Sequence, residues 1–376
     1  MYQICNRCIM DTSDPEITFD SNGYCNHCTR VLKEHRNEPY CFSPEQKKKR
    51  LEMLVATIKK RGKNNRYDCI IGVSGGVDSS YTAYQVKELG LRPLAVHLDN
   101  GWDSELSVMN IENICKKLSV DLFTYVIDWE EFKDLQLSFL KASTPDSEIP
   151  SDHAIVSILY KKAQKEGLNY IIAGTNFATE SILPHSWSQG HDDWKYIRSI
   201  QNKFGKMRLK SFPHRSILQR CYHKYIKRIK WINLLDYIEY DKEMAKKIIA
   251  QKLDWRDYGG KHLESNYTKI YQSYILPEKF EYDKRKAHLS SLICAGQINR
   301  KQAIDTMKEP LYAKSQLEED ILYLINKFSI SRKEFDEIMR LPPKSYRDYP
   351  NYANSWYASL HKGVKGCISK LTKRTI

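Results

Sequence analysis

Four cysteines near the start of the chain have the spacing of a metal site. They form two pairs, Cys5-x-x-Cys8 and Cys25-x-x-Cys28, with sixteen residues between the pairs. Two such knuckles can place four sulfur atoms tetrahedrally around one Zn²⁺, which leaves no open position for catalysis. We therefore expect a structural zinc ion, with four unmetallated thiols as the alternative. His27, inside the second knuckle, is interpreted as a bystander.

A glycine-rich turn joins an apolar strand to a helix and predicts an anion site. The sequence from residue 70 reads Ile-Ile-Gly-Val-Ser-Gly-Gly-Val-Asp-Ser-Ser. Glycines let backbone N–H groups converge on a phosphate, and the helix N-terminus adds partial positive charge. The Ser74, Ser79 and Ser80 hydroxyls can bond phosphate oxygens, while Asp78 can cap the helix or hold Mg²⁺. Neither Gly-Lys-Ser/Thr nor Gly-x-Gly-x-x-Gly is present, and an ordinary Gly-rich turn is the alternative.

The elements that position this turn alternate between short apolar runs and amphipathic stretches. Strands are expected at 68–73, 93–98, 122–127 and 169–173, with helices at 78–89, 105–118 and 153–165. Alternation of this kind predicts a parallel sheet covered by helices, with ligands bound at the carboxyl ends of the strands. A basic helix at 44–61 precedes the sheet, and a short strand is expected at 17–19.

Length and composition narrow the class of protein. The chain has 376 residues, a net charge of +14, 41% hydrophobic and 28% charged residues. These values exclude disordered and fibrous classes and favour two or three globular domains with an anionic partner. No apolar run approaches the ~18–20 residues of a membrane span, and the first residues lack a secretory apolar region. We therefore expect a cytoplasmic protein without a transmembrane segment.

The residues from Ser74 to Ser80, following an apolar strand, resemble the PP-loop signature of the ATP pyrophosphatases. The resemblance implies an α/β fold that cleaves ATP between the α and β phosphates, with Mg²⁺ bridging phosphate oxygens. A substrate oxygen would be adenylated, and a nitrogen or sulfur nucleophile would then displace AMP. The implied ATP-binding residues are those of the loop and of the ends of two further strands: Ser74, Gly75, Gly76, Val77, Asp78, Ser79, Ser80, Asp99, Gly174, Thr175 and Asn176.

Nearly the whole chain resembles the N-acetyl sugar amidotransferases of surface-polysaccharide biosynthesis. The likeness rests on the cysteine pairs and on five further segments, PSDHAI at 150–155, NFATE at 176–180, WRDYGGKH at 255–262, YILPEKF at 274–280 and AHLSSL at 287–292. It implies conversion of an acetamido group on a UDP- or CMP-linked sugar into an acetamidino group, for lipopolysaccharide O-antigen, capsule or flagellar glycan. It also implies ammonia from separate glutaminase and synthase-like subunits, and no nucleic-acid partner.

The chemistry of that conversion follows from the amide itself. An amide carbonyl is a poor electrophile, and transfer of AMP to its oxygen creates a good leaving group that ammonia can displace. The chain offers no glutaminase nucleophile of its own. Tyr2 stands where an N-terminal cysteine would be needed, and no cysteine lies in a Gly-x-Cys-x-Gly elbow.

Three further charged residues are candidates for the site. Lys261 follows a Gly-Gly turn and could clamp pyrophosphate or AMP, although a solvated lysine explains it equally well. Glu180 could orient Mg²⁺ or ammonia. Asp152 could touch substrate, but its better explanation is the N-cap of a helix that starts at His153.

We divide the chain into a four-cysteine zinc module at 1–43, a PP-loop ATP-binding domain at 44–200 and a mainly helical substrate or partner region at 201–376. Within the last region, residues 214–232 interleave cations with aromatic residues. Binding to nucleic acid, to a membrane surface or to a UDP-type diphosphate would explain them, and so would a helix with a solvated basic face. Cys69 and Cys115 are interpreted as core thiols.

The main rival function uses the same fold. A tRNA thiolase would also combine a zinc module, a PP-loop and a basic charge, but such enzymes generally need a reactive cysteine pair or an iron–sulfur cluster. No such pair is recognisable beyond the zinc motif. A nucleic-acid-binding adaptor with a degenerate ATP site is a third hypothesis, which the intact Ser-Gly-Gly-Val-Asp-Ser opposes.

Overall fold

A five-stranded parallel sheet organises the chain in this computed structural model, which describes residues 2–259, 264–312 and 314–354. The strand order is β3-β2-β1-β4-β5, and every pairing is parallel. The strands are β1 (Cys69–Gly72), β2 (Pro93–Asp99), β3 (Leu122–Val126), β4 (Tyr170–Ala173) and β5 (Lys230–Asn233). The α/β fold expected from the alternating pattern is confirmed.

Helices cover both faces of the sheet, because alternate strand residues point to opposite sides. Ile70 packs with one core cluster and Ile71 with the other, and Ile171 and Ile172 divide in the same way. The first cluster contains α5 (Trp129–Ala142), α6 (Ile149–Lys165) and α8 (Trp194–Phe204). The second contains α2 (Pro44–Gly62), α3 (Val77–Glu88), α4 (Glu105–Leu118) and α10 (Lys242–Leu253).

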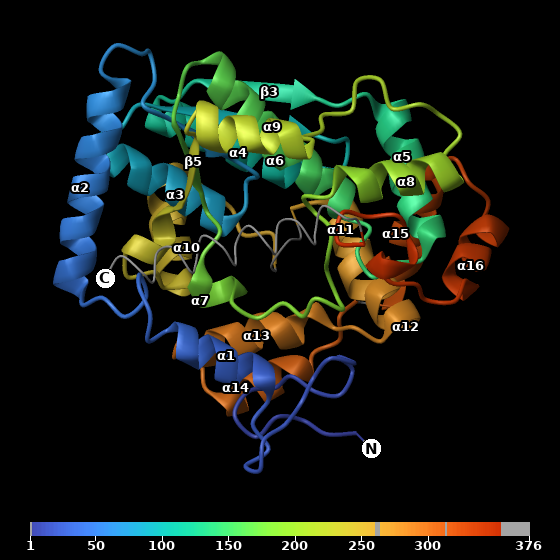
Figure 1. The fold of residues 1–376 in the computed structure, drawn as a ribbon. Coiled ribbons are helices and arrows are strands. Elements are labelled where there is room, and N and C mark those ends of the chain that lie inside the picture. Colours follow the sequence, from blue (N-terminus) through green and yellow to red (C-terminus); the bar gives the residue numbers. More distant parts are fainter. Residues whose placement is uncertain (1, 260–263, 313, 355–376) are drawn as a thin grey trace.

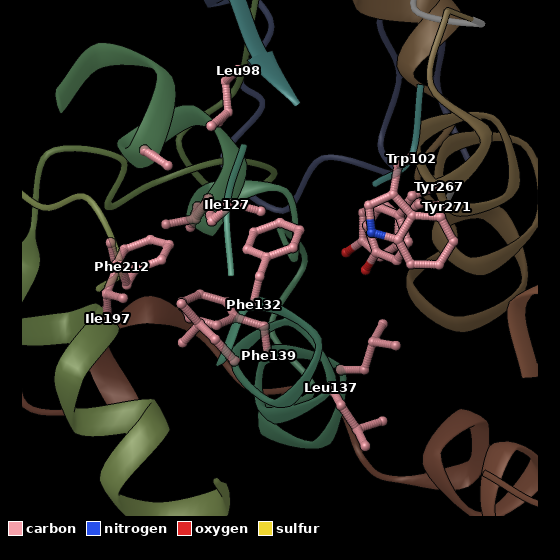
Figure 2. Close-up of a cluster of buried hydrophobic side chains, with 14 of the residues drawn as sticks. Leu98, Trp102, Ile127, Phe132, Leu137, Phe139, Ile197, Phe212, Tyr267 and Tyr271 are labelled. Atoms are coloured by element: carbon pink, nitrogen blue, oxygen red, sulfur yellow. The ribbon is translucent and has the colours of Figure 1, made fainter. Parts of the chain in front are cut away.

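The first cluster continues into the helices that follow residue 264. The Trp102 ring lies 5.2 Å from the Tyr267 ring, and Tyr267 stacks on Tyr271 at 5.6 Å. Figure 2 shows these three rings together beside Phe132 and Phe139 of α5. The helical region consists of α11 (Asn266–Ile270), η3 (Tyr271–Ile275), α12 (Leu276–Phe280), α13 (Lys284–Cys294), α14 (Arg300–Met307), α15 (Lys314–Phe328), α16 (Arg332–Arg340) and η4 (Tyr346–Asp348). It therefore shares a hydrophobic core with the sheet.

The cysteine module packs on helices from the far end of the sequence. Its helix α1 (Asn26–Glu34) contacts α13, and the pair lies with α14 at the bottom of Figure 1. Met10 and Val31 share a buried cluster with Trp187 and Ala287. The short strand expected at 17–19 is absent, since only an isolated bridge joins Phe19 to Cys25.

Four differences from the expected elements concern the sheet and its helices. Strand β5 and helix α5 were not predicted. The basic segment at 214–232 is helical only over α9 (Ile217–Cys221) and η1 (Tyr222–Ile226), and then supplies β5, which η2 (Leu234–Tyr237) follows. Helix α6 begins at Ile149, with Glu148 at the N-cap position, so the N-cap prediction for Asp152 is wrong.

No helix in the described part of the chain combines the length and apolar character needed to cross a membrane.

Candidate active site and zinc centre

The carboxyl ends of β1 and β4 meet where the strand order changes direction. From β1 the chain crosses to β2 and β3 on one side of the sheet, and then returns to β4 and β5 on the other. Crevices of this kind are where open α/β sheets bind their ligands. Two of the segments singled out in the sequence, 74–80 and 174–176, lie at these two adjacent strand ends.

The turn after β1 needs glycine and keeps two serines at its surface. Gly75 has φ +76°, and a Cβ there would lie 2.6 Å from the Ser107 carbonyl oxygen of α4. The Ser74 and Ser79 hydroxyl oxygens lie 3.2 Å apart, whereas Ser80 is buried and donates its hydroxyl hydrogen to Gly76. Helix α3 follows directly, so its first N–H groups face the turn. This geometry suits a bound phosphate group.

Gly174, at the end of β4, lies directly against the first turn of α3. A Cβ there would approach the Asp78 carbonyl carbon and oxygen to 2.8 Å. Thr175 donates a 2.7 Å hydrogen bond to the Asn233 side chain at the end of β5. Asn176 caps the four-residue helix α7 (Phe177–Glu180) by accepting a bond from the Thr179 N–H at 2.9 Å. The segment therefore closes the crevice by backbone contact and places Glu180 nearby.

Acidic and phenolic groups gather around Asp78. It occupies the second position of α3, while Gly76 is the N-cap residue, and its carboxylate accepts a hydrogen bond from the Tyr240 hydroxyl. Burial and the Asp78 charge raise the pKa of Tyr240 above its ordinary value, and Glu180 adds to the effect. Burial also raises the pKa of Asp236, which accepts the Phe177 N–H at 2.7 Å. The sequence carried no signal that Tyr240 would reach Asp78.

Residues 255–258, the start of the WRDYGGKH segment, pack on the turn. The Trp255 indole donates to the Gly75 carbonyl at 2.8 Å, and the Tyr258 hydroxyl accepts from the Val77 N–H at 3.3 Å. Asn110 of α4 holds the Arg256 backbone through bonds of 2.9 Å in both directions. The family resemblance identified this segment in the sequence, but it did not predict that Trp255 and Tyr258 contact the turn. Lys261 lies outside the described residues.

The end of β2 supplies a third wall. Asp99 accepts the Gly101 N–H at 2.9 Å and is half-buried. Next to it, His97 contacts the Val73 carbonyl at 3.0 Å and the Asp103 carboxylate at 3.1 Å. Burial alone would lower the pKa of His97, but the Asp103 carboxylate raises it above its ordinary value. His97 thereby ties the end of β2 to the backbone at the start of the turn and to Asp103.

The described residues fit both ATP and Mg²⁺. For ATP, the turn is a cradle that a Cβ would fill, since one on Gly76 would lie 3.2 Å from Ser74 Oγ, from the Tyr258 hydroxyl and from a Glu264 carboxylate oxygen. Magnesium is usually held by one or two carboxylates together with substrate phosphates and water. Asp78, in the first turn of α3, and Glu264, beside Gly76, are two carboxylates close to the turn.

The cysteine cluster fits a zinc ion closely. The four sulfur atoms of Cys5, Cys8, Cys25 and Cys28 lie within 4.8 Å of one another and all four residues are buried. The Cys5–Cys28 and Cys8–Cys25 sulfur pairs are 3.7 and 3.5 Å apart. A tetrahedron with Zn–S bonds of about 2.3 Å requires about 3.8 Å between sulfurs. His27 instead contacts Asp14 at 2.5 Å, in agreement with its interpretation as a bystander.

Two regions of the chain match known families. Residues 48–192 match the NAD synthase family, and residues 264–362 match the C-terminal domain of the WbpG-like LPS biosynthesis proteins. The first match runs from within α2 to the loop before α8 and covers the strands β1 to β4, the turn and Gly174, but not β5. The second match begins at residue 264, a few residues after Trp255 and Tyr258, which contact the turn.

Individual relatives each match less than half of the chain. An uncharacterized protein of Methanocaldococcus jannaschii is 28% identical over 45% of this chain and 58% of its own length. A tRNA-specific 2-thiouridylase of Proteus mirabilis is 29% identical over 30% of this chain and 34% of its own length. The chain therefore spans less than two thirds of these relatives.

Among solved structures, an NH3-dependent NAD synthetase of Campylobacter jejuni has 15% identity, with 71% of this chain and 99% of that chain covered. The TM-score of this pair is 0.33. The fold and the two family matches together show that the chain combines a PP-loop, NAD-synthase-like domain with a C-terminal region similar to that of an LPS biosynthesis protein.

Proposed function

We propose that this protein is an ATP-dependent amidotransferase that converts an acetamido group of a nucleotide-linked N-acetyl sugar into an acetamidino group. The observation that carries the proposal is the turn at 74–76 between β1 and α3, packed by the segment at 255–258 just before the LPS-related region. The PP-loop fold supports ATP use, and the C-terminal match supports a role in surface-polysaccharide biosynthesis.

The proposed reaction has two balanced steps. The acetamido oxygen attacks the α phosphate, and the bond to pyrophosphate breaks, which gives an O-adenylyl imidate. Ammonia then adds to the imidate carbon, and the C–O bond breaks, so AMP leaves with the oxygen of the original amide. The product is an amidine, which takes up the proton that ammonia releases. The products are AMP and pyrophosphate rather than ADP.

The residues of the chain would act mainly by binding and orientation. The turn and the N-terminus of α3 would hold the pyrophosphate, with Ser74 and Ser79 as hydroxyl donors. Mg²⁺, when bound, would neutralise charge on the phosphate oxygens, and Asp78 would hold it. The Tyr240 hydrogen bond would fix the orientation of the Asp78 carboxylate. Glu180 lies near enough to influence Tyr240 and would orient ammonia or the metal.

A tRNA thiolase remains the second candidate, because a tRNA-specific 2-thiouridylase is among the relatives of the PP-loop region. Thiolation would require a sulfur carrier. Of the cysteines outside the zinc cluster that the structure describes, Cys69 is fully buried, and burial raises the pKa of the half-buried Cys294 thiol to about 12. Cys41, in the loop before α2, and Cys221, at the end of α9, are exposed. Burial raises the pKa of the Cys115 thiol to about 11, which makes it a poor nucleophile. These thiols do not favour the rival.

Product analysis tests the proposal. Purified protein is incubated with ATP, Mg²⁺, ammonium and a UDP- or CMP-linked N-acetyl sugar whose acetamido oxygen is ¹⁸O. We expect AMP that carries the label, together with pyrophosphate and an amidino sugar. Asp78→Asn should abolish the reaction, while Glu88→Gln, at the exposed far end of the same helix, should not. ADP as the main product, or AMP formation that requires tRNA and ignores sugar, would replace this proposal with another function.

A further inference from the structure

A long stretch of the chain is entirely free of acidic residues. Residues 194–235 contain twelve Lys or Arg residues and no Asp or Glu, in a chain whose total net charge is +14. The stretch runs through α8, α9, η1 and β5. So one continuous segment accounts for most of the positive excess of the protein. Charge concentrated in this way attracts a polyanionic partner.

The helical part of this stretch exposes large apolar side chains. Leu218 is 80% exposed, Ile226 68%, Tyr225 64% and Tyr222 39%. Their spacing of i, i+4, i+7 and i+8 places them along one side of the consecutive helical turns α9 and η1. Figure 1 shows α9 on the side of the molecule opposite α13, α14 and the cysteine module. We call these four residues the apolar ridge.

Cations of the same segment line a hollow in the surface. Its volume is about 710 Å³, and Tyr160 and Trp231 contribute aromatic walls. Six cations line it, namely Arg61, Arg215, Arg220, Lys224, Arg228 and Lys230, against the single acid Asp192. Asp192 pairs with Arg215 at 3.1 Å and with Arg220 at 3.2 Å. The described chain offers no carboxylate partner to the other four cations. The hollow is therefore strongly positive.

We propose that the apolar ridge and the cations around it form a docking surface for an anionic lipid bilayer. The ridge would enter the headgroup region, and lipid phosphates would pair with the cations of the hollow and with Lys227, which follows η1 directly. Amphipathic helical segments bind membranes through this combination of apolar insertion and attraction to anionic headgroups. The surface is independent of the proposed reaction, since none of its residues belongs to the PP-loop crevice.

The composition of the ridge favours lipid over the other polyanions. A nucleic acid would use the cations and could stack on Tyr222 and Tyr225, but it gains little from exposed aliphatic groups. Leu218 and Ile226 are aliphatic, and they are the most exposed members of the ridge. An acidic protein would bury the aliphatic groups as well, but it would bind without lipid. These differences make the three partners separable by experiment.

Vesicle binding tests the surface directly. The full chain is sedimented with vesicles of phosphatidylcholine alone and with vesicles that also contain phosphatidylglycerol. We expect binding only to the anionic vesicles, and a large loss of binding in about 1 M NaCl, where the screening length is about 3 Å. Leu218→Ser with Ile226→Ser should weaken binding at least tenfold, as should Lys224→Gln with Lys227→Gln.

Matched variants separate the surface from nonspecific adhesion. Val126→Ser with Met244→Ser removes two apolar groups that are 68% and 63% exposed on other elements, and Lys252→Gln with Lys333→Gln removes two exposed cations elsewhere. Both control pairs should bind anionic vesicles like the original chain, and all variants should keep its melting temperature. The proposal would be overturned if the chain failed to bind anionic vesicles, or if the ridge variants and the control variants lost vesicle binding to the same extent. The proposal would also be overturned if the chain bound polyuridylate but not the vesicles, and if Leu218→Ser with Ile226→Ser left the binding to polyuridylate unchanged.

Discussion

The hydroxyl of Tyr240 donates a hydrogen bond to the carboxylate of Asp78, and so links a residue that follows β5 to the second position of α3. The contact lies beside the turn that would hold the phosphates of ATP. The hydrogen bond restrains the orientation of the Asp78 carboxylate at the helix start. Because burial raises the pKa of Tyr240, the phenol stays protonated and keeps donating throughout the neutral range.

Removing the Tyr240 hydroxyl should therefore slow the reaction without unfolding the protein. A hydrogen bond to a charged group contributes roughly 1.5–3 kcal/mol, so Tyr240→Phe should lower ATP turnover by about tenfold to a hundredfold. Tyr84→Phe, on the same helix as Asp78, serves as the matched control and should keep full activity. Release of pyrophosphate measures the effect. Equal turnover in Tyr240→Phe and the original chain would show that the contact does not matter for catalysis.

Gly174→Ala should displace the first turn of α3. The new Cβ would lie 2.8 Å from the Asp78 backbone, a distance that requires a backbone shift. Overpacking of this kind costs roughly 1–3 kcal/mol, and we expect at least a tenfold loss of turnover as well. Gly72→Ala is the control, because its Cβ would meet only Leu159 at 3.5 Å. The prediction would be contradicted if Gly174→Ala had the unfolding temperature of the original chain and also released pyrophosphate at the original rate.

The cysteine cluster predicts about one tightly bound zinc ion per chain. Cys25→Ser should lose the metal and lower the unfolding temperature. Four buried cysteines would bind the metal together, and the module that it holds folded packs on α13. Cys41→Ser, at an exposed position outside the cluster, should change neither. Elemental analysis and calorimetry measure the two quantities. Freshly purified protein without metal, prepared in the absence of chelators, would exclude structural zinc.

The buried imidazole of His153 predicts a loss of stability in acid. Its Nδ1 contacts the His191 carbonyl at 2.7 Å, and its Nε2 accepts the Arg215 N–H at 3.1 Å. Burial lowers the pKa of His153 from 6.5 to about 4. Between these two values the unfolded chain takes up a proton that the folded chain does not, so stability falls as the pH falls.

For one group this shift amounts to roughly 3 kcal/mol between pH 6.5 and pH 4. We expect His153→Gln to show a shallower fall in the free energy of unfolding over that range than the original chain. His185→Gln, at an exposed position, should follow the original chain. Urea titrations at a series of pH values give the slopes. Parallel slopes for His153→Gln and the original chain would assign the acid sensitivity to other groups.

The absence of a glutaminase motif predicts the nitrogen source. The isolated chain should use ammonium but not glutamine, and glutamine should support turnover only after glutaminase and synthase-like subunits are added. Amidino-sugar formation with each nitrogen source is measured by mass spectrometry. Glutamine-dependent turnover by the chain alone would show that it carries a glutaminase nucleophile outside the known motifs.

Much of the fold follows from local sequence patterns. Helix α4 has the expected bounds, and β1 to β4 lie within two residues of the expected ones. The strands β1, β2 and β4 are continuous buried, mainly apolar runs, and α4 is an amphipathic stretch with Ser104 as its N-cap. The cysteine spacing likewise predicted the sulfur cluster, because two short knuckles leave little freedom to their sulfur atoms. The turn at 74–76 is also a local feature, in which glycines permit a backbone that other residues would not adopt.

The sequence by itself determined the α/β class, the turn and the cysteine cluster, whereas the tertiary structure decided which distant groups surround the turn. Lys230–Asn233 lacks the continuous buried apolar run of β1 and β4, and it becomes β5 by pairing with the edge of β4. Tyr240 and Tyr258 reach the turn because β5 and α10 carry the chain back across the sheet. Such contacts depend on how the whole chain buries its apolar surface, and no local pattern encodes them.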